Sequence, residues 1–109
     1  MDRLQLRPDY RSAGRVAVFV STPWDREGRL LLRLPEAVSC DGKHLFAEWN
    51  RSQPWPSGQP VALPEWRAGA ADGSLTYTCS LTSGITLRAS VTPARDTLDL
   101  SFAIRNDTE

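Results

Sequence analysis

The last third of the chain constrains the fold most, because apolar and polar residues alternate there through three consecutive segments. Nearly all the residues between the apolar ones are polar, which gives the period of two that is typical of half-buried strands. The apolar positions are Leu75, Tyr77, Cys79 and Leu81, then Ile85, Leu87, Ala89 and Val91, then Leu98, Leu100, Phe102 and Ile104. The alternation predicts an antiparallel three-strand meander over residues 74–105, with one buried face and one face toward water.

The two links of this meander predict how its strands pair. Thr82-Ser83-Gly84 ends in glycine, as expected for a hairpin turn that closes with a left-handed residue, and it places Leu81 opposite Ile85. A second, four-residue link runs from Pro93 to Asp96. Counting outward from this link pairs Val91 with Leu98, Ala89 with Leu100, Leu87 with Phe102 and Ile85 with Ile104. Every predicted pair joins two apolar residues, so this register keeps the apolar face together.

Earlier segments predict shorter strands separated by turn-forming residues. Residues 15–22 and 28–34 read as strands, and residues 23–27 between them have turn chemistry, so this region predicts a hairpin. Residues 43–49 alternate loosely and predict a third strand. Residues 50–64 contain four of the eight prolines, which favours an extended crossing segment with a short strand near residues 61–63.

Short strands punctuated by Gly and Pro predict an all-β protein, either an antiparallel β-sandwich or the opening part of a larger one. A length of 109 residues suits a single domain over residues 1–109, complete or as the N-terminal portion of a longer protein. A complete chain is expected to have roughly seven or eight strands in two sheets. The strand over residues 97–105 is expected to be a poorly covered edge, through which the chain can self-associate.

Charge and hydropathy argue against two classes of partner. Thirteen basic and thirteen acidic residues cancel, so no excess charge favours nucleic acid or an anionic membrane. No run reaches the ~20 apolar residues that a membrane helix needs. Residues 1–8 contain no hydrophobic signal segment, and the sequence therefore assigns the protein to no compartment.

Residues with catalytic or metal-binding chemistry do not form a recognisable pattern. The spacing of the carboxylates does not select the pair that glycoside cleavage uses. His44 is the only histidine, and together with Cys40 it falls short of the ligand count of a zinc site. Cys40 and Cys79 define no disulfide framework and are expected to be free, with Cys79 on the buried face. We predict no catalytic residue, no metal site and no cofactor for this chain alone.

Four tryptophans are the strongest compositional indication of a binding function. An indole ring in a loop offers a flat apolar surface on which a sugar ring can stack. Trp24 and Trp55 are the candidate ligand-binding residues, because both lie beside prolines in turn-like segments, and Trp55 between two prolines is the preferred exposed candidate. The alternative is that the tryptophans fill the ends of the sandwich, since Trp is highly buried on average.

The final hairpin carries a family resemblance. Residues 84–93 and 98–108, which close with Asn106-Asp107-Thr108, resemble paired strands in the large β-sandwich of galactose mutarotase-like proteins and related carbohydrate-acting domains. The resemblance covers roughly the last 45 residues and rests on alternation and a short motif. In that family the catalytic acid and base lie beyond the corresponding point, so no catalytic residue is carried over. The resemblance implies the opening portion of a longer sugar-processing or sugar-binding protein.

Three functions remain as hypotheses. The first is a non-catalytic portion of a carbohydrate-associated β-sandwich protein. The second is a complete small carbohydrate-binding module that uses exposed tryptophans. The third is a structural or protein-interaction β-sandwich. The first is preferred, with carbohydrate as the expected ligand.

Overall fold

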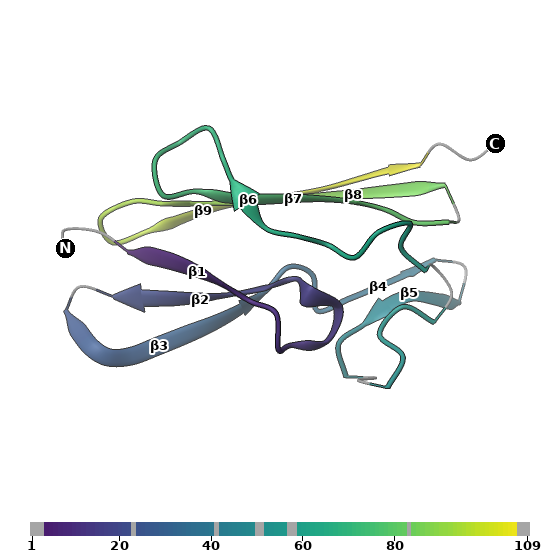
Figure 1. The fold of residues 1–109 in the computed structure, drawn as a ribbon, viewed down its shortest axis with the longest axis horizontal. Coiled ribbons are helices and arrows are strands. Elements are labelled where there is room, and N and C mark those ends of the chain that lie inside the picture. The colour runs from purple at the N-terminus through teal and green to yellow at the C-terminus, as the bar shows by residue number, and fades with distance from the viewer. Residues whose placement is uncertain are drawn as a thin grey trace.

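The computed structural model describes residues 4–22, 24–40, 42–49, 52–56, 59–82 and 84–106, with the backbone alone at residues 13, 25–28, 40 and 43. Within these ranges the protein is all-β and its strands pair antiparallel, as the sequence predicts, in an arrangement consistent with a β-sandwich (Figure 1). The described residues form nine strands, together with a short 3-10 helix at Ala13–Arg15.

The strands form three sheets. One contains β1 (Gln5–Asp9), β2 (Ala17–Thr22) and β3 (Asp25–Arg33) in sequence order. A second pairs β4 (Ala37–Cys40) with β5 (Lys43–Ala47). The third has the order β6 (Arg67–Ala68), β7 (Leu75–Ser80), β8 (Ile85–Pro93), β9 (Leu98–Asn106). In Figure 1 the four-stranded sheet forms the upper layer, and the two smaller sheets lie side by side beneath it.

The hydrophobic core is built from side chains of all three sheets and of the loops beside them. Its largest fully buried side chains include Tyr77, Phe46 and Leu87. Two tryptophans from the irregular segment after β5, Trp55 and Trp66, belong to the same cluster. The inward residues of β7 and β8 are buried except for the half-buried Leu75 and Ile85, which confirms the predicted apolar face for these two strands.

The first link of the meander has the predicted conformation. Gly84 has a φ of 89°, and Leu81 donates its backbone N–H to the carbonyl of Ile85 at 2.8 Å. Leu81 therefore lies opposite Ile85, as expected. Ser83, in the middle of this link, lies outside the described residues.

The second link differs from the prediction by two residues. Leu100 pairs with Val91 and Phe102 pairs with Ala89, so the predicted register is wrong. The reason is that Pro93 belongs to the ladder and pairs with Leu98, while the turn closes one residue later with a 2.8 Å bond from the N–H of Ala94 to the carbonyl of Thr97. A shift by two residues leaves the same side chains on the same face.

Upstream, the predicted hairpin is present as β2 and β3, but β3 begins at Asp25, so most of the expected turn is strand. The predicted strand near residues 61–63 is replaced by a single bridge between Pro60 and Leu81. Strands β1 and β4 were not predicted. Pro8 lies within β1, and because proline argues against a strand, β1 was missed. Proline is tolerated there because β1 is an edge strand.

Candidate functional site

Trp55 does not form the exposed surface that the sequence predicted. Its side chain is only 4% exposed and packs on Phe46, with 4.6 Å between ring centroids. The preceding carbonyl, that of Pro54, accepts the N–H of Ala47 at 2.8 Å, which brings this loop against the end of β5. The proline-flanked setting thus places the indole in the core, and the expectation of an exposed Trp55 is wrong.

The other sequence candidate, Trp24, is 67% exposed in the turn between β2 and β3. Figure 1 shows this turn at the opposite end of the molecule from the β4–β5 hairpin against which Trp55 packs. The structure therefore does not bring the two predicted binding residues together. Trp49 is also exposed and contacts His44 edge-to-face, whereas Trp66 is buried against Tyr77.

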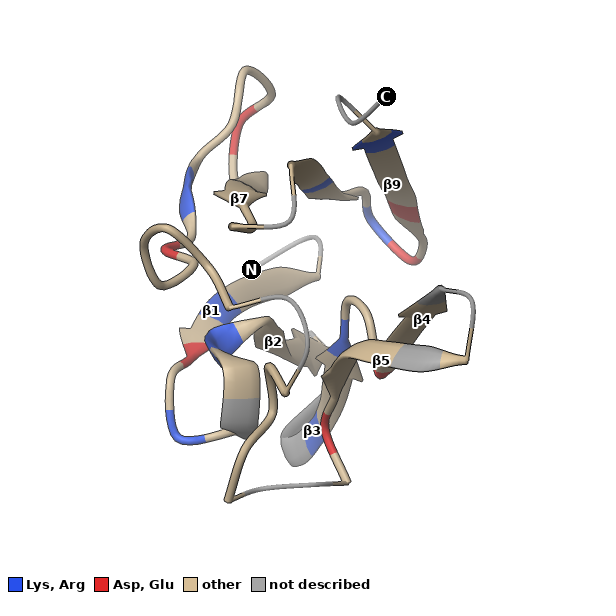
Figure 2. Cartoon of the chain, turned by 90° about the vertical axis from the view of Figure 1, so that its right-hand side faces the viewer, with Lys and Arg blue, Asp and Glu red and all other residues tan. Residues whose placement is uncertain are grey.

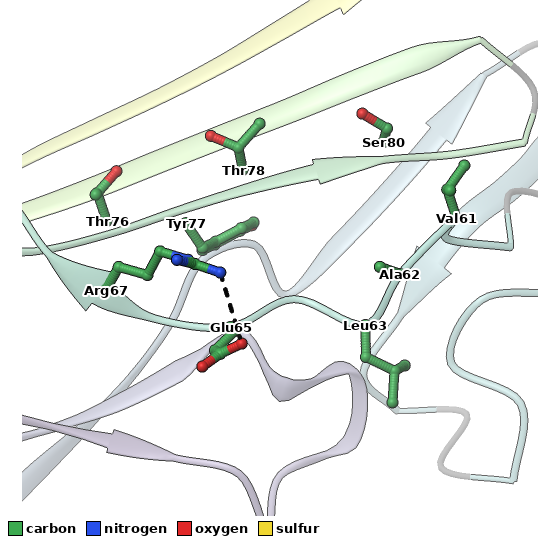
Figure 3. A pocket seen from close by; sticks show the side chains of 9 residues that line it. All are labelled: Val61, Ala62, Leu63, Glu65, Arg67, Thr76, Tyr77, Thr78 and Ser80. Atoms are coloured by element: carbon green, nitrogen blue, oxygen red, sulfur yellow. Dashed lines mark ion pairs between the residues drawn. The ribbon is translucent and has the colours of Figure 1, made fainter.

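A groove of about 440 Å³ runs along the outer side of β7 (Figure 3). One wall consists of Thr76, Thr78 and Ser80, which alternate along β7 and therefore project from the same face of the sheet. The other wall is the irregular segment that leads into β6. The lining residues are Val61, Ala62, Leu63, Glu65, Arg67, Thr76, Tyr77, Thr78 and Ser80.

Backbone hydrogen bonds explain why the groove opens at this place. At one end of β7, the N–H of Val61 donates to the carbonyl of Ser80 at 2.6 Å. At the other end, Arg67 of β6 pairs with Thr76. Between these two attachments the chain leaves the edge of β7, and buried Pro64 and Trp66 direct it toward the core. The groove is the space left between the strand and this segment.

Charged and hydroxyl groups lie along the groove. The Nη2 atom of Arg67 is 3.9 Å from the Oε2 atom of Glu65, and both side chains are largely exposed. An exposed ion pair of this kind is weak, so both groups can exchange their partner for a ligand. The Thr76 hydroxyl donates to the carbonyl of Ala89 at 2.8 Å, whereas Thr78 and Ser80 are exposed to solvent.

Tyr77 forms the inner side of the groove with a chemically inert ring. Its hydroxyl donates to the carbonyl of Leu34, across the core. Burial, with a smaller contribution from Cys79, raises the pKa of Tyr77. The phenol therefore stays neutral at physiological pH and has a structural role.

An ion pair between the buried Glu48 side chain and the partly exposed Arg33 side chain lies away from the groove. Glu48 follows β5, and its Oε1 atom is 3.6 Å from the Nε atom of Arg33 at the end of β3. The backbone N–H of Glu48 donates to the carbonyl of Glu36 at 2.9 Å. These contacts join the end of β3 to the end of β5, and we therefore assign Glu48 a structural role.

The sequence reasoning missed the groove. It correctly assigned Thr76, Thr78 and Ser80 to the polar face of a strand, and Figure 3 shows them along β7. It could not find Glu65 and Arg67, because the contact of their segment with β7 depends on pairings between residues distant in sequence. The polar alternation of β7 was the only signal available.

Within the described ranges, no three His, Cys, Asp or Glu side chains are grouped closely enough to bind a metal ion. Cys79 is a free, buried thiol, while the side chain of Cys40 lies outside the description. In the same part of the chain, no helix has the length and apolar character needed to cross a membrane.

We found no match to the chain among protein-family models, curated proteins or solved structures.

Proposed function

We propose that this chain is the non-catalytic portion of a carbohydrate-associated β-sandwich protein and that it binds sugar hydroxyl groups in the groove beside β7. The observation that supports this proposal is that the row of hydroxyl side chains on β7 lines the same groove as the exposed pair of Glu65 and Arg67. These groups offer both donors and acceptors along one continuous surface.

The geometry of the groove suits an extended polar ligand. Alternate residues on a strand are about 7 Å apart, so Thr76, Thr78 and Ser80 offer repeated contacts along its length. Glu65 accepts and Arg67 donates charge-assisted hydrogen bonds, which are stronger than bonds between neutral groups. Exposed Val61 and Leu63 provide apolar contacts for the C–H faces of a sugar ring.

Two further features support a protein that binds a sugar without cleaving it. Glu65 is the one carboxylate among the described residues that line the groove, whereas glycoside cleavage ordinarily uses two. The last third of the chain also resembles galactose mutarotase-like proteins, and we propose a relationship to that group. Trp24 is a second, separate place where a sugar ring can stack, because it lies in the turn between β2 and β3 of the opposite layer.

The test is a glycan array followed by calorimetric titration of the glycan that binds best. Glu65→Gln removes the negative charge at an exposed position and should weaken binding about tenfold, since a hydrogen bond to a charged group contributes about 1.5–3 kcal/mol. The melting temperature should not change. Glu36→Gln alters another exposed carboxylate, which lies outside the groove, and should bind like the unaltered protein.

A third variant distinguishes the two candidate surfaces. If Trp24→Ala abolishes binding and Glu65→Gln does not, the ligand binds at the β2–β3 turn and the groove assignment is wrong. If no glycan binds the unaltered protein, the carbohydrate proposal itself is wrong.

A further inference from the structure

Strand β9 presents an apolar surface that the proposed function does not use. Leu100, Phe102 and Ile104 point toward the inner side of the sheet, yet they are 50%, 37% and 53% exposed. Figure 2 shows β9 at the outer edge of its layer, and among the described residues β8 is the one strand that pairs with it. A contiguous exposed apolar stripe on an edge strand is typical of an interaction site.

The backbone of β9 is oriented for pairing on its open side. The N–H of Ala94 donates to the carbonyl of Thr97, which makes Thr97 and every second residue after it the ones bonded to β8. The residues between them are Leu98, Leu100, Phe102 and Ile104, whose N–H and C=O groups are directed away from β8. The apolar residues therefore present both their side chains and their backbone groups to a partner.

We propose that two copies of this chain associate by antiparallel pairing of β9 with β9, about a two-fold axis at Phe102. In this register Phe102 faces Phe102 of the second copy, and Leu100 faces Ile104. All these residues have the backbone phase required for cross-strand hydrogen bonds. The pairing spans the whole of β9 and joins the two four-stranded sheets into one.

Charge complementarity selects this register and favours a second copy as the partner. Asp99 and Arg105 are the charged residues of β9, and they lie at equal distances from Phe102 along the strand. A two-fold axis at Phe102 places Asp99 opposite Arg105 of the second copy on both sides of the axis. The other positions with outward backbone groups give no such pair: an axis at Leu100 sets Asp99 opposite Ser101, and an axis at Ile104 sets Arg105 opposite Ala103. Directly opposed residues of opposite charge stabilise strand pairing, so the axis at Phe102 is preferred.

The same contact covers the apolar stripe. Side chains that face each other across paired strands lie on the same side of the sheet. The exposed Leu100, Phe102 and Ile104 of one copy would then lie beside those of the other, and each copy would shield the other's stripe from water. This inference does not depend on whether the groove binds a sugar.

A charge-swap series in sedimentation velocity tests the register. Asp99→Arg sets two arginines opposite each other, and Arg105→Asp sets two aspartates opposite each other, so each should weaken dimerisation about tenfold or more. The double variant restores opposite charges and should recover the affinity of the unaltered protein. Recovery in the double variant also shows that the single variants did not fail through misfolding.

Cross-linking tests the position of the axis. Facing residues in a hydrogen-bonded pair have Cα atoms about 5.5 Å apart, which a disulfide can bridge. Phe102→Cys should therefore give a covalent dimer on mild oxidation, identified by the linked peptide in mass spectrometry. Leu98→Cys is the matched control, because its two copies would be about 27 Å apart.

Three results would overturn the proposal. The first is a protein that remains monomeric at the highest soluble concentration. The second is a dimer that the single charge variants do not weaken. The third is a dimer in which Phe102→Cys fails to cross-link, since another surface would then mediate the association.

Discussion

Strands β8 and β9 are neighbours in one sheet and carry the same apolar alternation, yet three of their facing pairs of inward side chains differ sharply in burial. Leu87, Ala89 and Val91 of β8 are fully buried, whereas their register partners on β9 are substantially exposed. The difference arises because the core cluster includes inward side chains of β7 and β8, whereas Leu100, Phe102 and Ile104 of β9 lie outside it. A period of two thus reports which way a side chain points, and it carries no information on whether another layer covers it.

The largest expected effect is a difference in folding stability between alanine variants of two facing residues, one on each strand. Leu87 is fully buried and pairs with Ile104, which is half exposed. Leu87→Ala should destabilise the fold by about 2–5 kcal/mol, because it leaves a cavity in the core. Ile104→Ala should cost about 1 kcal/mol or less, because half of that side chain already contacts water. Urea unfolding at low protein concentration measures both, and equal losses would contradict the difference in coverage.

A smaller effect is expected in the links that bracket β8. Gly84 has a positive φ, so Gly84→Val should cost about 1–2 kcal/mol through the strain of a β-branched residue in a left-handed conformation. Ala94, in the link to β9, is exposed and has no positive φ, and Ala94→Val should change stability by about 0.5 kcal/mol or less. Denaturant melts of the two variants make the comparison. A neutral Gly84→Val would show that this turn tolerates other conformations.

The smallest expected effect is a loss of folding stability that is absent at neutral pH and occurs only at alkaline pH. Burial raises the pKa of the Cys79 thiol from 9.0 to about 11. Because the folded-state pKa is the higher one, the thiol contributes stability below about pH 9, and this contribution is lost as the pH rises toward 11. Cys79→Ala should therefore flatten the alkaline decline of the melting temperature.

The reaction rates of two thiols compare the exposure of the inward face of β7 with that of β9. At a protein concentration where the reduced chain is monomeric, Cys79 should react slowly with a thiol reagent at pH 8, whereas the more exposed thiol of Phe102→Cys should react much faster. A Cys40→Ser background keeps the third cysteine out of the measurement. Equal rates would show that the inward face of β7 opens as readily as that of β9.

The parts of the fold that could be predicted are those encoded by nearest neighbours. The alternation from Leu75 onward and the glycine at position 84 predicted β7, β8, β9 and one turn. The register of β9 was wrong by two residues because Pro93 was assigned to the turn. Its missing N–H costs no bond to β9, since the phase of the ladder directs that position toward β7, which has already ended.

The parts that could not be predicted depend on contacts between distant residues. Trp55 lies between prolines, a setting equally compatible with an exposed loop and with a core side chain, and only its contact with Phe46 decides between them. The wall of the groove depends likewise on the attachment of Val61 to Ser80 and of Arg67 to Thr76. Local sequence carries no record of these pairings.

The double attachment beside β7 has a consequence for how this scaffold can acquire new specificities. The segment between Val61 and Arg67 is fixed to β7 at both ends, while the exposed residues Ala62, Leu63 and Glu65 between these attachments take part in no ladder. Residues inserted there, next to Leu63 for example, would lengthen a loop whose two attachments to β7 stay in place. Insertions could then change the width and chemistry of the groove without altering any strand pairing. This loop is therefore a suitable position for a library of engineered binding loops.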